Sequence, residues 1–187
     1  MVSTLPEIPL LQRAFYFMRH GETESNLHGA IAGSTDVALT RKGHDQARAA
    51  ALMLRGHGID VLCASPLSRA HETARYIATE LGLPITVIAE LAERNWGELE
   101  GQPRGVRVRG VTPPGAEPSA DFLRRVTRGL RQVPAASTPL LVAHSGVFRV
   151  LCRILGIVES EAPVANAHPV RFAPGAGPQA PWRMQML

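Results

Sequence analysis

The sequence predicts an α/β fold with a largely parallel central sheet, built as a single domain by residues 1–187. Short apolar runs of strand length alternate with longer amphipathic stretches, a pattern typical of strands joined by crossover helices. Hydrophobic residues make up 45% of the chain, enough to bury one substantial core. We find no internal repeat and no second domain. Residues 1–13 contain two prolines and lack a basic n-region, so we expect a loose leader and no secretory signal.

The first half of the chain predicts two strands and two helices in alternation. The apolar run at 14–18 predicts the first strand, and Thr40 is a suitable N-cap for the first helix, which glycines at 56 and 58 should end. The apolar residues of this helix recur at helical spacing: Ala47, Ala50, Ala51 and Leu54. The run 61–64 predicts the second strand. A second helix is expected from about Leu67 to Leu81, closed by Gly82.

The second half continues the alternation after one irregular segment. A third strand is expected at 85–88, and the proline- and glycine-rich residues 101–119 are expected to be irregular. Helices are expected at 120–133 and 147–155, on either side of a strand at 140–143. The pieces 169–173 and 182–187 are strand-like, and the loose PGAGPQAP between them predicts a hairpin.

The charge of the chain favours small anions as partners. The formal net charge is +4 and the sequence pI is about 9.8, which suits nucleic acid, a membrane surface or small anions. The arginines are scattered, however, and no aromatic-rich RNA motif or basic helix-turn-helix pattern is present. No stretch is long and apolar enough to span a bilayer. We therefore expect neither nucleic acid nor a membrane as a partner, and the sequence makes no prediction of oligomeric state.

Both cysteines lie inside apolar runs, at Cys63 and Cys152. Such residues are more often buried thiols than a disulfide, and buried thiols are typical of a reducing compartment. We therefore expect a cytoplasmic protein.

Polar residues follow three of the expected strands. Arg19 and His20 come directly after the first strand, Ser65 and then Arg69 after the second, and His144 after the fourth. The carboxyl ends of parallel strands share one edge of a sheet, and ligands bind in the crevice there. The helices that begin nearby direct their positive N-termini at the same crevice. These residues together predict an anion site.

A phosphate monoester fits such a site best. Its dianion matches Arg19 and Arg69, whose planar guanidinium groups can each engage two oxygens. A neutral imidazole beside a charge-neutralised phosphate is a competent nucleophile, so we interpret His20 as the phosphoryl acceptor. The two arginines should keep the pKa of His20 low enough for the neutral form near neutral pH.

The departing alkoxide needs a proton, and Glu93, on the loop after the third strand, is a candidate general acid. From spacing alone, Glu93 is as well explained as a solvated carboxylate, as are its neighbours Glu90, Glu98 and Glu100. His144 has three interpretations: a phosphate ligand, an electrophile that stabilises the transition state, or a cap of the next helix. We interpret the other histidines as structural or surface residues: His28, His44, His57, His71 and His168.

Five ordered segments resemble the successive blocks of the histidine phosphatase superfamily, in its phosphoglycerate-mutase-like branch. They are RHGETESN, LTRKGHDQA, SPLSRAHETA, LAERNWGELEG and VAHSGVFR, and they cover most of the chain from Phe15 to Arg153. The resemblance implies a three-layer αβα sandwich and phosphoryl transfer without a metal or other cofactor.

The resemblance also assigns roles to individual residues. It implies a phosphate pocket of Arg19, His20, Arg69 and His144, with His20 as the residue that is phosphorylated. Glu93 matches the position of the family's acid. Asn26 matches an asparagine that helps to bind the phosphoryl group, and Thr23 matches a position that lines the site.

Departures from the mutases favour a phosphatase acting on a small phosphorylated metabolite. Arg94 in ERNWG resembles the mutases, which carry a much longer insertion after this block to close the site. A shorter cover should leave a phosphohistidine open to water. A serine also follows His144, where the mutases commonly have asparagine. Three more arginines follow in the same loop: Arg104, Arg107 and Arg109. Together with Arg94 they either bind a second anionic group of the substrate or form a solvated basic surface.

Three other functions are weighed against this one. A phosphoglycerate mutase, or a phosphatase dedicated to one metabolite, stays within the family. A catalytically silent module that docks phosphorylated partners is the second, although no residue of the chemical set has been lost. A serine hydrolase built on AHSGV is a poor match, because its nucleophile elbow requires glycines where this chain has Ala143 and Val147.

Overall fold

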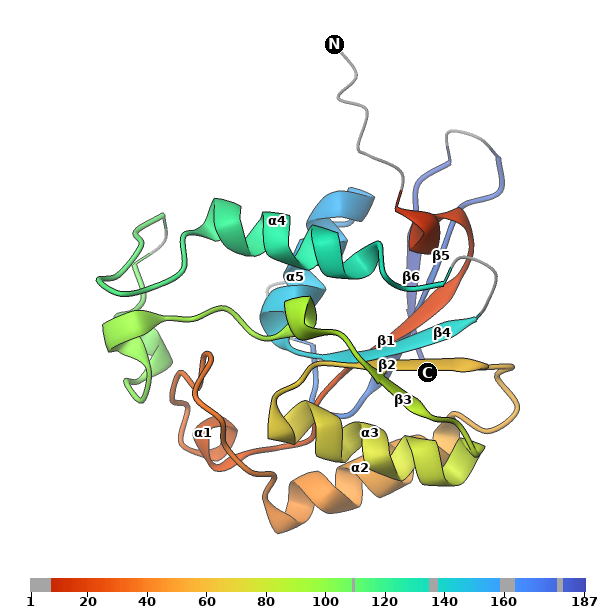
Figure 1. Ribbon diagram of the computed structural model, residues 1–187, viewed down its shortest axis with the longest axis horizontal. Helices are drawn as coiled ribbons and strands as arrows, with labels where there is room; N and C mark the ends of the chain where they lie inside the picture. The colour runs from red at the N-terminus through yellow and green to blue at the C-terminus, as the bar shows by residue number, and fades with distance from the viewer. Residues whose placement is uncertain (1–7, 109, 135–137, 159–163, 178–179) are drawn as a thin grey trace.

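The computed structural model describes residues 8–108, 110–134, 138–158, 164–177 and 180–187 (Figure 1). Within these residues six strands form one sheet in the order β3-β2-β4-β1-β5-β6. The strands are β1 (Phe15–Arg19), β2 (Val61–Ala64), β3 (Ile85–Val87), β4 (Pro139–Ala143), β5 (Pro169–Ala173) and β6 (Arg183–Met186). The helices are α1 (Glu24–Leu27), α2 (Arg41–Met53), α3 (Ser68–Leu81), α4 (Ser119–Leu130) and α5 (Ser145–Leu155). The 3-10 turns are η1 (Pro9–Gln12), η2 (Ala89–Leu91), η3 (Gly97–Leu99) and η4 (Arg104–Val106).

The sheet is mostly parallel, as the sequence predicts. β1 pairs with β4, β4 with β2, and β2 with β3, all in parallel. β5 runs antiparallel to β1, and β6 antiparallel to β5, so the expected C-terminal hairpin is confirmed. Because the four parallel strands point the same way, the carboxyl ends of β1, β2 and β4 lie at one edge of the sheet.

Helices cover both faces of the sheet and make three layers (Figure 1). Phe15 and Phe17 of β1 belong to the core cluster that also contains residues of α4 and α5. Tyr16 and Met18 belong to the other cluster, which contains residues of α2 and α3. Successive strand residues point to opposite faces, so a strand covered on both sides must be apolar throughout. The fold is therefore the expected αβα sandwich.

The helix boundaries follow the signals in the sequence. Thr40 caps α2, because its hydroxyl accepts a hydrogen bond from the Gly43 N–H at 3.0 Å. Gly82 and Gly156 end α3 and α5 in the left-handed conformation. α5 begins at Ser145, two residues earlier than expected. None of the described helices is long and apolar enough to cross a membrane.

The N-terminal segment was expected to be a loose leader up to residue 13, but from residue 8 onwards it is folded against the domain. Residues 1–7 lie outside the described residues, but the chain from residue 8 folds into η1 and buries Ile8 and Leu10 in the core beneath α4 and α5. The apolar surface that these two side chains bury holds the segment against the domain.

Candidate active site

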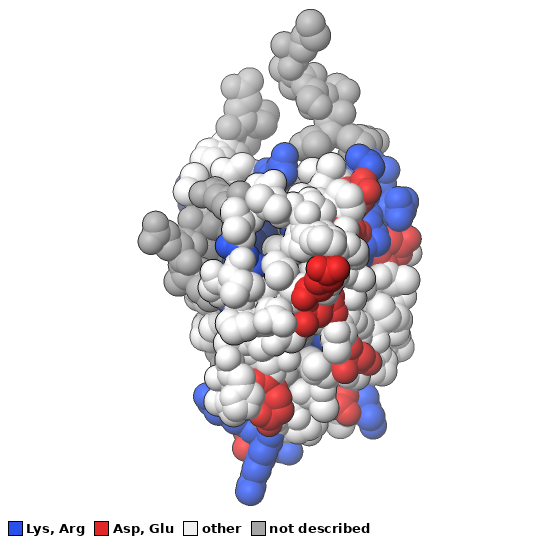
Figure 2. Space-filling view, turned by 90° about the vertical axis from the view of Figure 1, so that its left-hand side faces the viewer, with Lys and Arg blue, Asp and Glu red and all other residues white. Residues whose placement is uncertain are grey.

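A cavity of about 250 Å³ opens at the edge where β1, β2 and β4 end. Figure 2 faces this end of the molecule, and arginine side chains are visible in a hollow between uncharged residues. The cavity is lined by the backbone segment 30–33 and by Arg19, His20, Asn26, Arg69, Glu93, Trp96, Arg104, Arg107, Ser145 and Arg149. Among these described residues five are arginines and one is a carboxylate, so the cavity has a strong excess of positive charge.

His20 is held in one orientation at the end of β1. Its backbone N–H donates to the Ala143 carbonyl at 3.0 Å, and its ring Nδ1 lies 2.7 Å from the Gly21 carbonyl oxygen. A carbonyl only accepts, so Nδ1 carries the proton and Nε2 keeps its lone pair. Burial, and then the charges of Arg69 and Arg19, hold the pKa of His20 well below its usual value. The imidazole is therefore neutral at neutral pH.

A glycine after His20 is required by the packing of α2. A Cβ atom on Gly21 would lie 2.5 Å from the Gly43 carbonyl oxygen. The chain leaving the site therefore passes directly against the first turn of α2. This contact gives a structural reason for the third residue of the Arg-His-Gly sequence.

The two arginines of the predicted pocket are buried and anchored to backbone carbonyls. Arg19 donates through Nη1 to Val164 at 3.0 Å, and Arg69 donates to Thr35 and Gly33 at 2.9 and 2.7 Å. Their buried Nε atoms have no partner among the described residues. Burial, followed by the charge of Arg104, lowers the pKa of Arg19 to about 10, so this guanidinium remains charged at neutral pH. Buried unpartnered donors and unbalanced charge both favour a bound anion.

His144 is buried next to His20. It is fully buried, its ring centroid is 5.3 Å from that of His20, and its Nε2 is 2.7 Å from the Ser65 hydroxyl. Its Nδ1 has no partner among the described residues. Burial, followed by the charge of Arg69, holds the pKa of His144 well below its usual value. The side chain makes no hydrogen bond that caps α5, so the helix-capping interpretation does not hold.

Glu93 is fixed by backbone donors. One carboxylate oxygen accepts from the Arg94 N–H at 2.8 Å and the other from the Gly146 N–H at 2.9 Å, in the first turn of α5. A Cβ on Gly146 would lie 2.0 Å from the Glu93 carboxylate, so only glycine allows this approach. Of the four carboxylates considered from the sequence, Glu93 is the one that lines the cavity.

Asn26 lines the cavity, whereas Thr23 supports it from behind. The Asn26 Oδ1 accepts from the Thr23 N–H at 3.2 Å and from Asn166 at 2.9 Å. Because both of these hydrogen bonds end on the Asn26 oxygen, the Asn26 amide N–H groups remain as potential donors to a ligand. Thr23 is fully buried and caps α1 by accepting from the Asn26 N–H, so it positions Asn26 and does not line the cavity.

The arginines of the loop after Glu93 are divided between two places. Arg94 is stacked 4.3 Å over the Trp96 ring and donates to the Glu117 carbonyl at 2.8 Å, and it does not line the cavity that contains His20. Arg104 and Arg107 do line it. Arg109 lies outside the described residues.

Three residues of the site were not identified from the sequence. Arg149 lies one turn after Ser145 in α5, and this helical spacing could have revealed it. Trp96 lies within a segment that was recognised, but an aromatic residue in a loop carries no specific signal. Asn166, which holds Asn26 and also donates to the His20 carbonyl at 2.9 Å, has no signal in the sequence. Among the described residues no group of three His, Cys, Asp or Glu side chains is placed to hold a metal ion.

The fold and this cavity define a phosphoryl-transfer family. The family model of the histidine phosphatase superfamily (branch 1) matches residues 15–172. The chain belongs to this superfamily, and it is an α/β protein of the phosphoglycerate-mutase-like fold.

Individual relatives carry phosphatase and mutase names. The chain is 33% identical over 144 residues to the uncharacterized phosphatase PhoE of Bacillus subtilis, covering 74% of this chain and 75% of that protein. It is 33% identical to a 2,3-bisphosphoglycerate-dependent phosphoglycerate mutase of Methylobacterium radiotolerans, covering 82% and 84%. Among solved structures, the alpha-ribazole phosphatase of Shigella flexneri superposes with a TM-score of 0.78 at 25% identity, covering 93% and 95%.

Proposed function

We propose that this protein is a phosphomonoester hydrolase that works through a phosphohistidine on His20, with Glu93 as general acid and base. The observation that carries the proposal is the fixed orientation of His20. Its Nδ1 is engaged by the Gly21 carbonyl, so the nucleophilic lone pair is on Nε2, in a cavity also lined by Arg19 and Arg69. A nucleophile in such a place meets a phosphoryl group whose charge is already neutralised.

In the first half-reaction, Nε2 of His20 attacks phosphorus as the P–O bond to the alcohol breaks. Glu93 in its acid form gives its proton to the leaving oxygen, so the alcohol departs neutral. Arg19 and Arg69 stabilise the equatorial oxygens of the transferring group, and the Asn26 amide is a further donor.

In the second half-reaction, water attacks the phosphohistidine. Glu93, now a carboxylate, takes the proton from the attacking water while the N–P bond breaks. Inorganic phosphate leaves, and both His20 and Glu93 return to their starting states.

His144 acts in this proposal as a proton-bearing ligand of the phosphoryl group. The Ser65 hydroxyl oxygen already accepts from the Leu67 N–H at 3.3 Å, so its own proton is available for Nε2 of His144. A neutral His144 then carries its proton on Nδ1, the atom that has no partner among the described residues. That N–H is a donor for an anion bound beside His20.

Hydrolysis is favoured over mutase transfer by the cover of the site. Between Glu93 and α4 the described chain forms only the short turns η3 and η4, and the cavity is open to the surface (Figure 2). Water therefore reaches the phosphohistidine more readily than in a closed site. We propose a small phosphorylated metabolite as substrate. Cys63 is a buried thiol, the usual state of a cysteine in a reducing compartment, and it supports the proposal of a cytoplasmic location.

The test is a panel of phosphomonoesters scored for phosphate release, with trapping of the phosphoenzyme after rapid quenching. We expect release from several esters and a phosphoenzyme that is stable in base and labile in acid, as a phosphohistidine is. Isomerisation of phosphoglycerate that is faster than phosphate release would establish the mutase instead. A protein that binds phosphate but forms no phosphoenzyme would establish the silent module.

A further inference from the structure

The carboxylate of Glu100 is held next to the candidate active-site cavity without lining it. It follows the turn η3 on the loop after Glu93, and the residue is partly buried. The described part of the chain supplies five donors to its two oxygens. The proposed function, on which this inference rests, gives these contacts no task.

The hydrogen bonds of Glu100 fasten one loop to another. Its Oε1 accepts from the Ser34 N–H at 2.7 Å, from the Ser34 hydroxyl at 2.9 Å and from the Trp96 N–H at 3.0 Å. Its Oε2 accepts from the Thr35 N–H at 2.8 Å and also from the Thr35 hydroxyl. The chain after α1 is therefore attached to the loop that contains η3 (Figure 1).

The same short segment after α1 holds Arg69, the proposed ligand of the phosphoryl group. Arg69 donates to the Gly33 carbonyl at 2.7 Å and to the Thr35 carbonyl at 2.9 Å. The Gly33 carbonyl and the Ser34 N–H belong to one planar peptide group, in which they point in opposite directions. Glu100 therefore binds one end of this peptide group, and Arg69 binds the other end.

Both charged groups are fixed strongly by this arrangement. Burial alone would raise the pKa of Glu100, but hydrogen bonds from Thr35, Trp96 and Ser34 lower it, so the carboxylate is charged at neutral pH. Hydrogen bonds to an ionised acceptor are shorter and stronger than neutral ones, and bonds in a chain polarise one another. Arg69 is buried, so a shift of the 33–35 segment would move its guanidinium as well.

We propose that Glu100 is a positioning residue for Arg69. It sets the place of the guanidinium through the peptide group between Gly33 and Ser34, and it contacts neither the phosphoryl group nor the leaving group. Its role thus differs from that of Glu93, and also from that of a solvated loop carboxylate.

Binding of methylphosphonate tests this role apart from turnover, because a phosphonate is not cleaved. Glu100→Gln keeps the shape of the side chain but turns an NH₂ group towards at least one backbone N–H of residues 34 and 35. We expect calorimetry to show about fivefold weaker binding, since Arg69 is displaced. Removal of a negative charge would by itself strengthen the binding of an anion. Equal or tighter binding by Glu100→Gln would therefore overturn the inference.

A matched variant removes the same charge from the same loop. Glu98 is exposed in η3 and does not line the cavity. Glu98→Gln should keep the affinity for methylphosphonate within about twofold of wild type. A loss in Glu98→Gln equal to that in Glu100→Gln would show that the charge of the loop matters and not the contact with residues 34 and 35, and the inference would fall.

A double-mutant cycle shows whether Glu100 acts through Arg69. 4-Nitrophenyl phosphate is the substrate, because its leaving group needs no proton and the contribution of Glu93 is then small. Glu100→Gln alone should lower kcat/KM about tenfold, but in an Arg69→Gln background it should change kcat/KM by no more than about twofold. Losses that multiply in the double variant would show that Glu100 acts elsewhere.

A second variant keeps the test valid if Glu100→Gln does not fold, which urea unfolding would show. Thr35 is exposed, and Thr35→Val keeps the outline of the side chain while it removes one donor to the carboxylate. It should lower kcat/KM about threefold, and this loss should vanish in the Arg69→Gln background. A loss that persists there would overturn the inference.

The outcomes separate this inference from the proposed function. Weaker methylphosphonate binding by Glu100→Gln, in a protein that releases no phosphate from any ester, would support the positioning role and overturn the hydrolase. Phosphate release by wild type, with Glu100→Gln equal to it in affinity and rate, would overturn the positioning role and leave the hydrolase intact.

Discussion

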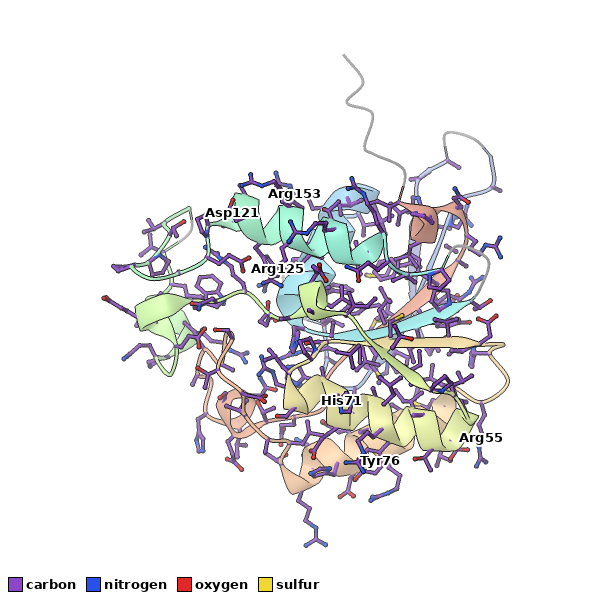
Figure 3. All side chains as sticks on the ribbon, in the orientation of Figure 1. Arg55, His71, Tyr76, Asp121, Arg125 and Arg153 are labelled. Carbon is purple, nitrogen blue, oxygen red and sulfur yellow. The ribbon has the colours of Figure 1, made fainter. Side chains whose placement is uncertain are left out.

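The candidate active-site cavity and the groove between α2 and α3 contain the same kinds of side chain in opposite electrostatic settings. The groove is lined by His44, Arg48, Glu72 and Tyr76 among others. There, His44 lies 3.8 Å from the carboxylate of Glu72 and 3.2 Å from the Tyr76 hydroxyl, and Tyr76 lies on the outside of the domain (Figure 3).

Charge balance and burial distinguish the two regions. In the groove, Arg48 pairs with the Asp45 carboxylate at 2.7 Å, with side chains 59% and 63% exposed. In the cavity, His20 and Arg69 are buried, and among the described lining residues five arginines face one carboxylate, that of Glu93. Surface pairs that neutralise each other contribute little, whereas buried unbalanced charge requires a ligand. The difference teaches that a histidine and an arginine form a candidate chemical site when they are buried and held by neutral backbone groups rather than by carboxylates.

The largest effect is expected from replacing His20, the proposed nucleophile. His20→Asn should lower phosphate release by about 10⁴-fold or more, because no other group at this place can accept the phosphoryl. The matched change His44→Asn in the groove should stay within about twofold of wild type. Steady-state rates on benzyl phosphate measure both. Similar rates for His20→Asn and wild type would show that the phosphoryl group goes elsewhere.

Replacing Glu93, the proposed proton donor, should give the next largest effect, and this effect should depend on the ester. Glu93→Gln should slow alkyl phosphates by about 10³-fold, because their alkoxide must be protonated as it leaves. It should slow 4-nitrophenyl phosphate much less, because that leaving group needs no proton. Glu72→Gln serves as the matched control in the groove. Equal losses on both esters would mean that another group donates the proton.

Loss of one anchored guanidinium should cost less. Arg69→Gln should lower kcat/KM by about 10²-fold, as for one preorganised donor to a developing charge. The amide retains a donor for the Gly33 and Thr35 carbonyls, and urea unfolding would check that the fold persists. Arg48→Gln in the groove should have no measurable effect. If the two variants lost activity equally, the excess charge of the cavity would not be the cause.

The smallest effect concerns stability and pH. His20 and His144 have folded-state pKa values well below 6.5, whereas in the unfolded chain they titrate near that value. The unfolded chain thus binds more protons below pH 6.5, so stability is complete above that pH and falls as pH drops towards the folded pKa values. Each histidine should contribute about 1.4 kcal/mol per pH unit in that window.

Urea unfolding at pH 7.0, 6.0 and 5.5 measures this slope. His144→Gln should remove about half of it. A slope that stays the same in His144→Gln would mean that the buried histidine does not titrate differently in the folded state.

Much of the fold could be predicted because the local signals agree with the tertiary structure. β2 and β5 have the expected bounds, since each is a short apolar run between turn residues, and glycines end α3 and α5 where expected. The prediction of a loose N-terminal leader was wrong from residue 8 onwards. Two prolines and the lack of a signal pattern suggested a loose segment, but burial of Ile8 and Leu10 in the core holds residues 8–12 in place.

The candidate site was predictable where residues lie at strand ends, and less so where loops decide. Arg19, His20 and Arg69 lie together because parallel strands share an edge, which the sequence pattern already implies. Arg94 was expected to bind substrate, and this stays a prediction: its guanidinium stacks on Trp96 and donates to the Glu117 carbonyl, a contact between segments 23 residues apart, and it lines a cavity next to that of His20. No local pattern encodes such a contact.

The sequence by itself determined which chemical groups this protein has and the order in which the sheet would deliver them, because hydrophobic periodicity sets the strands and the strands set one common edge. Only the tertiary structure decided the protonated nitrogen of His20, the burial of His144 next to it, and the contact of Glu93 with the first turn of α5. Each of these depends on contacts between segments far apart in the chain, whose distances are fixed only when the layers pack.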